Sequence, residues 1–265
     1  MTVPQISITE PRGPAGAPLV VLGAALGTAT TLWDAATDLL RDRYRVLSFD
    51  HPGHGASPVP LEPFTIADVG AGVLNALDSI GEREFHYAGV SLGGTVGLEL
   101  LLTASDRILS AAIICSGAKI GEAPGWYERA ATVRADGTAS LMSGASARWF
   151  TPASIEHDSP MTTGILNSLR DTDDESYALC CEALANFDVR YTLDRVAKPV
   201  LALWADHDEV TPESLSTFIA EGVQHGRVHE IKNASHLAPA EQPAAVAAVL
   251  NEFFARSTGS EFLAL

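Results

Sequence analysis

The sequence has 265 residues, of which 46% are hydrophobic and 19% are charged, so it can build a sizeable core and has no bias toward disorder. Its formal net charge of −16 repels phosphate backbones, and its lysines and arginines are scattered, which argues against a nucleic-acid partner. Three cysteines, two of them adjacent, cannot build a disulfide framework and favour a reducing cytoplasm. The sequence leaves open whether the chain forms a homo-oligomer.

No part of the sequence predicts a targeting or membrane segment. The chain start lacks a basic stretch followed by an apolar run, and no later stretch approaches 18 uninterrupted apolar residues. We therefore expect no membrane partner. We assign no role to the tail STGSEFLAL after residue 256.

Short apolar runs alternate with helical patterns along the chain. Unbroken apolar strands imply burial on both faces, as in a parallel sheet covered by helices. The predicted strands occupy residues 18–23, 44–50, 85–90, 108–115, 199–205 and 228–232. This alternation predicts an α/β fold with a mostly parallel central sheet flanked by helices.

Two segments between or after these strands have clear helical spacing. Residues 65–81 place apolar side chains on one face, with Thr65 as the N-cap and Gly81 at the end of the helix. The segment PAAVAAVLNEFFA at 243–255 has the same pattern. Both are expected to cover the sheet.

Residues 121–195 interrupt the alternation, because they hold helix-like pieces without a clear strand. The simplest explanation is a helical cap, or lid, inserted between two strands of the sheet. The core of the α/β domain is then formed by residues 1–120 and 196–265.

Residues 86–101, HYAGVSLGGTVGLELL, place one serine between glycines where a predicted strand meets a helix. This G-x-S-x-G pattern is typical of a nucleophile elbow, a sharp turn that strains the serine backbone. Side chains at Gly89 and Gly93 would clash in such a turn, and Gly94 lets the helix pack closely on the strand. The pattern predicts Ser91 as a nucleophile; the alternative is a serine that binds an anion at a helix N-terminus.

A serine nucleophile needs a base within hydrogen-bond reach and an acid that orients the base. The loop DHDEVTP follows the strand at 199–205 and supplies Asp206 and Asp208, and the loop NASHLAPAEQP supplies His236. Both loops follow predicted strands, at the edge where sites in open α/β sheets lie. The order serine, acid, histidine is that of an α/β-hydrolase triad.

Two clusters also resemble sets of metal ligands. They are Asp50 with His51-x-x-His54, and the run of acidic and histidine residues at 206–209. Neither has i, i+4 helical spacing or a distant matching cluster, so we expect solvated loop residues and no metal ion. His54 is expected to support the turn around Gly53.

Six segments together resemble the α/β-hydrolases and, more closely, the 3-oxoadipate enol-lactonases: LGTATTLW, DHPGHGAS, GVSLGG, ARWFTP, DHDEVTP and ASHLAPAEQP. The resemblance covers the chain from about residue 15 to 255. It implies Asp208, rather than Asp206, as the acid of the triad. It also implies that the backbone N–H groups of Leu26 and Leu92 form the oxyanion hole.

The substrate pocket is where this chain departs most from the family. Pro52 stands where the enol-lactonases usually carry an arginine, and a proline cannot hold a carboxylate. The resemblance places Trp126, Arg148 and Trp149 in the lining of the pocket. Candidates for binding a substrate's acid group are Arg129, Arg134, Arg148 and Arg190.

The sequence predicts a serine hydrolase that cleaves a small lactone or ester through an acyl-enzyme, without a metal or organic cofactor. The resemblance implies an enol-lactonase of aromatic-compound catabolism. Hydrolysis of a carbon–carbon bond in a ring-cleavage product, or cofactor-free perhydrolysis, would use the same triad and stays open. A third alternative also stays open, in which the protein has the same fold and binds a small molecule without catalysis.

Overall fold

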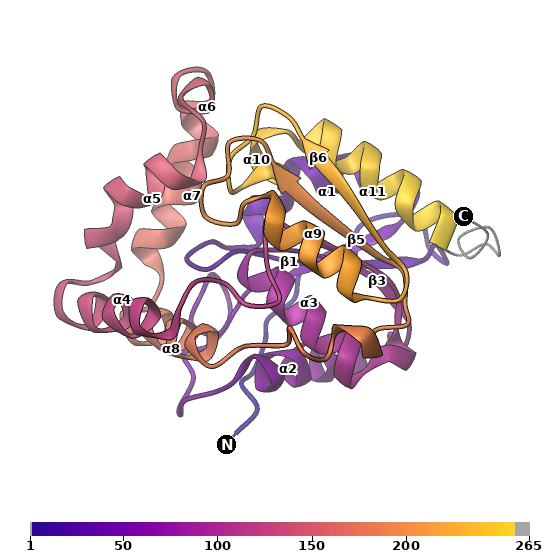
Figure 1. Cartoon of the computed structure of the whole chain (residues 1–265), viewed down its shortest axis with the longest axis horizontal. Coiled ribbons are helices and arrows are strands. Elements are labelled where there is room, and N and C mark those ends of the chain that lie inside the picture. Colours follow the sequence, from indigo (N-terminus) through magenta and orange to yellow (C-terminus); the bar gives the residue numbers. More distant parts are fainter. Residues whose placement is uncertain (1, 258–265) are drawn as a thin grey trace.

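The chain folds around one parallel sheet in a computed structural model that describes residues 2–257 (Figure 1). The strands lie in the order β2-β1-β3-β4-β5-β6, and all neighbouring pairs are parallel. Their bounds are β1 Leu19–Gly23, β2 Arg45–Phe49, β3 Phe85–Val90, β4 Ile108–Ile114, β5 Val200–Ala205 and β6 Gly226–Ile231. The predicted α/β fold is confirmed; residues 258–265 of the tail lie outside the described residues.

Burial explains which strands the sequence predicts well. The central strands β1 and β3 are buried along their whole length, as their mostly apolar sequences predict; β3 also buries His86. Strand β6 lies at one edge of the sheet and has exposed side chains, and it begins two residues before the predicted range of 228–232. Its polar start, Gly226-Arg227, does not stand out as a strand because an edge needs less apolar cover.

Helices cover both faces of the sheet. Figure 1 shows α1 and α11 on one side and α2 and α3 on the other, while α9 packs against β5 and β6. Their bounds are α1 Asp34–Leu40, α2 Ile66–Ser79, α3 Leu92–Thr103, α9 Glu213–Gly222, the short α10 Ala238–Glu241 and α11 Pro243–Ser257. None of the helices in residues 2–257 combines the length and the apolar composition that a membrane crossing requires.

The predicted ends of α2 are confirmed. The Thr65 side chain accepts from the Asp68 N–H at 3.1 Å, and the Asp68 carboxylate accepts from the Thr65 N–H at 2.9 Å. This capping box satisfies two N–H groups that the first turn leaves free. Gly81 follows the helix with a φ of 79°, a left-handed conformation that glycine adopts without strain.

Five helices lie between β4 and β5 and gather beyond one end of the sheet, at the left of Figure 1. They are α4 Ala123–Asp136, α5 Met142–Trp149, α6 Pro152–His157, α7 Ser159–Asp171 and α8 Asp174–Ala185. Helix α4 packs against α8, and α7 packs against α5 and α6. We refer to α4–α8 as the cap; its boundaries at 121 and 195 stay a prediction.

The strand order reverses between β1 and β3. The chain leaves β1 for β2 on one side of the sheet, and later returns to pair β3 with the other side of β1. In open α/β sheets a crevice forms at the carboxyl ends of the two strands that flank such a reversal. The loop after β1 and the turn after β3 therefore meet at the expected site.

Candidate active site

Ser91 lies in a strained turn between β3 and α3. Its φ of 54° and ψ of −115° are unfavourable for a residue with a side chain. A methyl group on Gly89 would overlap the Gly93 carbonyl, and one on Gly93 would overlap the Gly23 carbonyl. The glycines on either side of Ser91 are therefore required by the close approach of backbone in this turn.

Hydrogen bonds from neighbouring strands fix the backbone of the turn. The Ser91 N–H donates to the Ile114 carbonyl at 3.0 Å, and the Ser116 hydroxyl donates to the Ser91 carbonyl at 2.7 Å. The buried Tyr87 hydroxyl donates to the Gly93 carbonyl at 2.6 Å. These bonds from three different segments hold the turn in its strained conformation.

Asp208 and His236 form a buried pair at the carboxyl ends of β5 and β6. The Nδ1 atom of His236 lies 3.0 and 3.2 Å from the two carboxylate oxygens of Asp208. The Thr211 hydroxyl donates to the same carboxylate at 2.5 Å, and the backbone N–H groups of Val210 and Thr211 donate at 2.8 and 3.1 Å. Asp206 instead accepts from the backbone and has no contact of this kind with His236 among the described residues.

Opposing effects act on the ionisation of Asp208. Burial raises the pKa of this carboxyl, but the nearby His236 and the hydrogen bonds from His236 and Thr211 lower it more. The net pKa lies below its ordinary value, so Asp208 is ionised near neutral pH. An ionised carboxylate at Nδ1 orients the imidazole and leaves Nε2 as its free nitrogen.

Cys115 links the serine turn to the acid and the histidine. It follows β4 directly, next to Ile114, whose carbonyl accepts from Ser91. Burial, and then the neighbouring Asp208, raise the pKa of the Cys115 thiol. Ser91 and the Asp208–His236 pair thus lie at the same end of the sheet, on either side of Cys115. Their roles as nucleophile, acid and base stay predictions.

Two free backbone N–H groups lie beside the serine turn. The Gly93 N–H donates to the Ala24 carbonyl at 3.0 Å, which ties α3 to the loop after β1. Within residues 2–257, the N–H groups of Leu26 and Leu92 have no hydrogen-bond acceptor. Both residues are buried, so each N–H group is an unsatisfied donor of the kind that an oxyanion hole requires.

The prediction that His51 and His54 are solvated is wrong. Both side chains are fully buried, and both form hydrogen bonds with the loop that follows β1. His51 Nε2–H donates to the Ala24 carbonyl at 2.7 Å. Gly27 N–H donates to His54 Nε2 at 3.0 Å, and His54 Nδ1–H donates to the Pro52 carbonyl at 2.9 Å.

These bonds define which nitrogen of each ring carries the proton, since a carbonyl only accepts and an N–H only donates. Burial lowers the pKa of His51 to about 3 and that of His54 to about 4, so both are neutral near neutral pH.

Asp50 is also buried and completes this support. Its carboxylate accepts from the Thr30 N–H at 2.7 Å and from the Ala56 N–H at 2.9 Å. The segment DHPGHGAS therefore fixes the loop at 24–30 through the side chains of Asp50, His51 and His54. The burial of Asp50 and His51 is not predicted by the sequence, because it depends on the tertiary contacts of this loop. In the second cluster, Asp206, His207 and Glu209 are exposed as expected.

The cap reaches the loop after β1 through three side chains. A methyl group on Gly27 would meet Leu169 and lie 3.1 Å from Tyr177 and 3.4 Å from Trp149. Trp149 is buried in this contact. Trp126 and Arg148 are half-buried on the cap helices α4 and α5. The lining role predicted for these residues stays a prediction.

Glu241 joins the cap to the loop that carries His236. One carboxylate oxygen accepts from the Thr151 N–H at 2.7 Å and the other from the Ser235 N–H at 2.6 Å. The Leu237 N–H donates to the Trp149 carbonyl at 3.2 Å. The position of His236 is therefore coupled to the end of helix α5.

Two pockets open where the cap meets the core. One has a volume of about 390 Å³ and includes Leu32, Ile165 and Ala240 in its lining. The other, of about 500 Å³, includes Thr151 and Glu241. These volumes suit small molecules.

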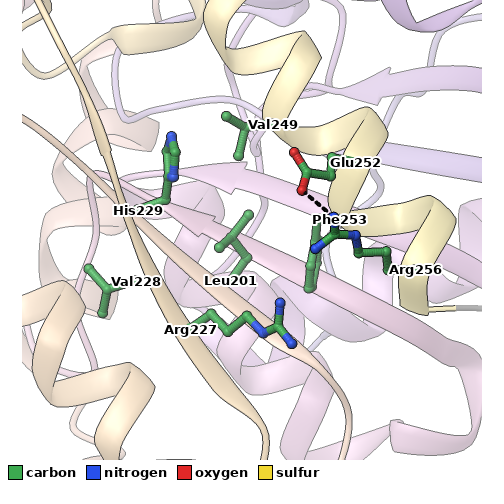
Figure 2. A pocket seen from close by; sticks show the side chains of 8 residues that line it. All are labelled: Leu201, Arg227, Val228, His229, Val249, Glu252, Phe253 and Arg256. Atoms are coloured by element: carbon green, nitrogen blue, oxygen red, sulfur yellow. Dashed lines mark ion pairs between the residues drawn. The ribbon is translucent and has the colours of Figure 1, made fainter. Parts of the chain in front are cut away.

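A third pocket, of about 250 Å³, lies between β6 and α11 (Figure 2). None of the predicted site residues lines any of these three pockets. Within the described part of the chain, no group of three or more His, Cys, Asp or Glu side chains could hold a metal ion.

The sequence pattern of the alpha/beta hydrolase family matches residues 19–249. The chain belongs to this family. It is 35% identical over 245 residues to "3-oxoadipate enol-lactonase 2" of Acinetobacter baylyi, with 91% of each chain covered. These matches confirm the predicted membership of the α/β-hydrolases and the predicted similarity to the enol-lactonases.

Solved structures of other α/β-hydrolases have the same fold. The enol-lactonase from Burkholderia xenovorans matches with a TM-score of 0.91 at 29% identity, covering 94% of this chain and 96% of that one. A hydrolase from Pseudomonas aeruginosa matches with a TM-score of 0.87 at 34% identity, covering 94% and 92%. The shared fold extends through the cap as well as the sheet.

Proposed function

We propose that this α/β-hydrolase cleaves a small lactone or carboxylic ester through an acyl-enzyme at Ser91, as an enol-lactonase of aromatic-compound catabolism. The observation that carries the proposal is the buried Asp208–His236 pair, held at the carboxyl ends of the strands beside a strained serine turn. The similarity to 3-oxoadipate enol-lactonases over most of the chain supports the substrate class.

In the proposed acylation step, Ser91 Oγ attacks the carbonyl carbon while His236 Nε2 takes the hydroxyl proton. The oxyanion is held by the free N–H groups of Leu26 and Leu92, and Asp208 stabilises the imidazolium. The carbon–oxygen bond then breaks and His236 returns the proton to the leaving group. From an enol-lactone this group is an enol or enolate that becomes a ketone, which makes acylation easier than for an alkyl ester.

In the deacylation step, water displaces Ser91 from the acyl carbon; after opening of a lactone, the former leaving group stays attached to the acyl chain. His236 takes a proton from the water, whose oxygen attacks the acyl carbon, and then returns a proton to Ser91 Oγ as the acid product leaves. Every proton that the cycle moves is carried by His236. The proposed chemistry therefore uses this chain's own side chains and backbone N–H groups, the substrate and water. We place this activity in the cytoplasm.

The test is hydrolysis of 3-oxoadipate enol-lactone, followed by the loss of its ultraviolet absorbance. We expect turnover by the wild type and none by Ser91→Ala. Turnover of other lactones but not of this one would overturn the enol-lactone assignment and leave the broader one. A folded wild type that hydrolyses no lactone or ester would overturn both in favour of a non-catalytic binding protein.

A further inference from the structure

Within residues 2–257, the shortest hydrogen bond to the Asp208 carboxylate comes from the hydroxyl of Thr211. This hydroxyl donates to Oδ2 at 2.5 Å, whereas the backbone N–H groups of Val210 and Thr211 donate to Oδ1 at 2.8 and 3.1 Å. An oxygen–oxygen distance of this size is typical of a hydroxyl bound to an ionised carboxylate, which is a strong hydrogen bond. Thr211 is fully buried, so water does not compete for its hydroxyl.

The local sequence restricts the Thr211 side chain to few conformations. Thr211 lies in the segment DHDEVTP between β5 and α9, directly before Pro212. A residue before a proline is biased toward extended backbone, and a β-branched side chain has few staggered positions about χ1. The conformation that the loop adopts aims the hydroxyl back at Asp208, three residues earlier in the chain.

The three donors of this loop leave one direction of the carboxylate open, and His236 occupies it. An ionised carboxylate accepts about four hydrogen bonds. The Nδ1 atom of His236 lies 3.0 Å from Oδ2 and 3.2 Å from Oδ1, so the imidazole shares each oxygen with a donor of the loop. The Thr211 hydroxyl also lies 3.5 Å from Nδ1. Thr211 therefore contacts both partners of the pair and fixes the rotation of the carboxylate relative to the ring.

The hydroxyl also changes how strongly the carboxylate attracts a proton. Burial raises the pKa of Asp208, but the charge of His236 and the hydrogen bonds from His236 and Thr211 lower it below its ordinary value. Without the hydroxyl, Oδ2 would be more basic and would attract the protonated imidazole more strongly. His236 would then keep its proton to a higher pH.

Other titratable groups face this pair from neighbouring elements. Cys115 follows β4, and burial together with the nearby Asp208 raises the pKa of its thiol, so the thiol stays neutral. Glu241 on α10 is already held by backbone N–H groups of two other segments. Three further groups of the loop are exposed to solvent, which screens their charge: Asp206, His207 and Glu209. Thr211 is uncharged, so its substitution tests a hydrogen bond without changing the net charge.

We propose that Thr211 is a positioning residue of this site: its hydroxyl holds the Asp208 carboxylate in the orientation that His236 needs, and sets the pH at which His236 loses its proton and becomes a base. The inference rests on the proposed function for the role of His236. It goes beyond that function because it gives Thr211, which is not assigned to any reacting atom, control over the pH range of the reaction.

The experiment measures kcat/KM for 4-nitrophenyl acetate from about pH 5.5 to 9 in three variants. Thr211→Val removes the hydroxyl at nearly constant volume, Thr211→Ala removes it with less crowding of the carboxylate, and Thr211→Ser keeps it. In the valine and alanine variants we expect the acid limb of the profile to move up by about 0.5–1 pH unit, and kcat to fall about tenfold with little change in KM. Thr211→Ser stays within about threefold of the wild type, with its acid limb unshifted.

Thr138→Val is the matched control. Thr138 lies between α4 and α5 of the cap, is also buried, and donates its hydroxyl to the Arg170 carbonyl at 3.3 Å. Its substitution is expected to lower the free energy of unfolding without moving the pH profile. An unshifted acid limb in Thr211→Val and Thr211→Ala would overturn the proposal even if kcat falls, because a purely structural role lowers activity at every pH alike. A shift of the same size in Thr138→Val or Thr211→Ser would also overturn it.

A measurement without turnover separates this inference from the hydrolase itself. In Ser91→Ala protein with isotope-labelled histidine, NMR follows the titration of His236, whose signal is identified by its loss in His236→Gln. We expect the titration midpoint to rise by about 0.5–1 pH unit when Thr211→Val is added. Such a rise, with a wild type that hydrolyses no ester, would keep the role of Thr211 and remove the hydrolase. Ester hydrolysis by the wild type, with equal midpoints in the two proteins, would keep the hydrolase and overturn the inference.

Discussion

His54 accepts the Gly27 N–H at 3.0 Å through Nε2, while its Nδ1–H donates to the carbonyl of Pro52. The imidazole therefore joins the motif DHPGHGAS to the loop after β1, one residue beyond Leu26. His51 holds the other end of the same loop at the Ala24 carbonyl. The two histidines fix the direction of the Leu26 N–H, although neither touches the reacting atoms.

Replacement of His54 tests this positioning role. His54→Leu removes the acceptor for Gly27, and we expect kcat for ester hydrolysis to fall about 100-fold with little change in KM, as for the loss of an oxyanion donor. His54→Gln places an oxygen close to the former Nε2 and is expected to recover about tenfold of this loss. A purely structural role would lower the melting temperature of both variants and leave kcat of the folded fraction unchanged.

Substitutions of Ser91 separate strain from chemistry. Glycine adopts φ 54°, ψ −115° with less strain than alanine, so we expect Ser91→Gly to be about 1 kcal/mol more stable than Ser91→Ala in urea unfolding. Both variants are inactive, since both lack the hydroxyl. Equal stability of the two variants would show that the turn stores no strain at this residue.

Glu241 tests the coupling between the cap and His236. Glu241→Ala leaves the buried N–H groups of Thr151 and Ser235 without their acceptor, which costs about 1–3 kcal/mol for each unsatisfied group. We expect a lower unfolding midpoint and a lower kcat, with part of both recovered by Glu241→Gln. Glu252→Ala on α11, whose carboxylate pairs with the exposed Arg256, is the control and leaves kcat unchanged.

The buried histidines predict how stability depends on pH. Burial holds the pKa of His51 near 3 and the pKa values of His54 and His86 near 4, against an ordinary value of 6.5. The unfolded chain binds protons at these histidines below pH 6.5 and the native chain does not, so stability is lost as the pH falls from about 6.5 toward 4. The expected loss reaches about 4 kcal/mol per pH unit, or about 1.4 for each histidine.

Urea unfolding at pH 7, 6 and 5 measures this effect. The steepest fall in unfolding free energy is expected between pH 6 and 5. A free energy that stays constant from pH 7 to pH 5 would mean that the three histidines titrate normally in the native protein.

The sequence predicts the serine turn well because its constraints are local. A side chain at Gly89 or Gly93 would overlap backbone a few residues away or in the neighbouring strand β1. The strand that leads into the turn, β3, is mostly apolar. The loops that carry Asp208 and His236 are also predictable, since carboxyl ends of parallel strands meet at one edge.

The roles of His51 and His54 were not predictable in the same way. Two histidines and an aspartate in a glycine-rich loop have the composition of a solvated turn. Their burial depends on β1, β2 and cap residues such as Tyr177 meeting around them, which is a property of the tertiary fold.

Labelling with a fluorophosphonate tests the central claim most directly, because the reagent reacts only with a serine that a neighbouring base activates. We predict a single phosphonylated residue, Ser91, identified by mass spectrometry of the native protein. The label is lost in Ser91→Ala and falls by orders of magnitude in His236→Ala. A native, folded protein that takes no label, or that takes it with equal speed when His236 is replaced, would contradict the account.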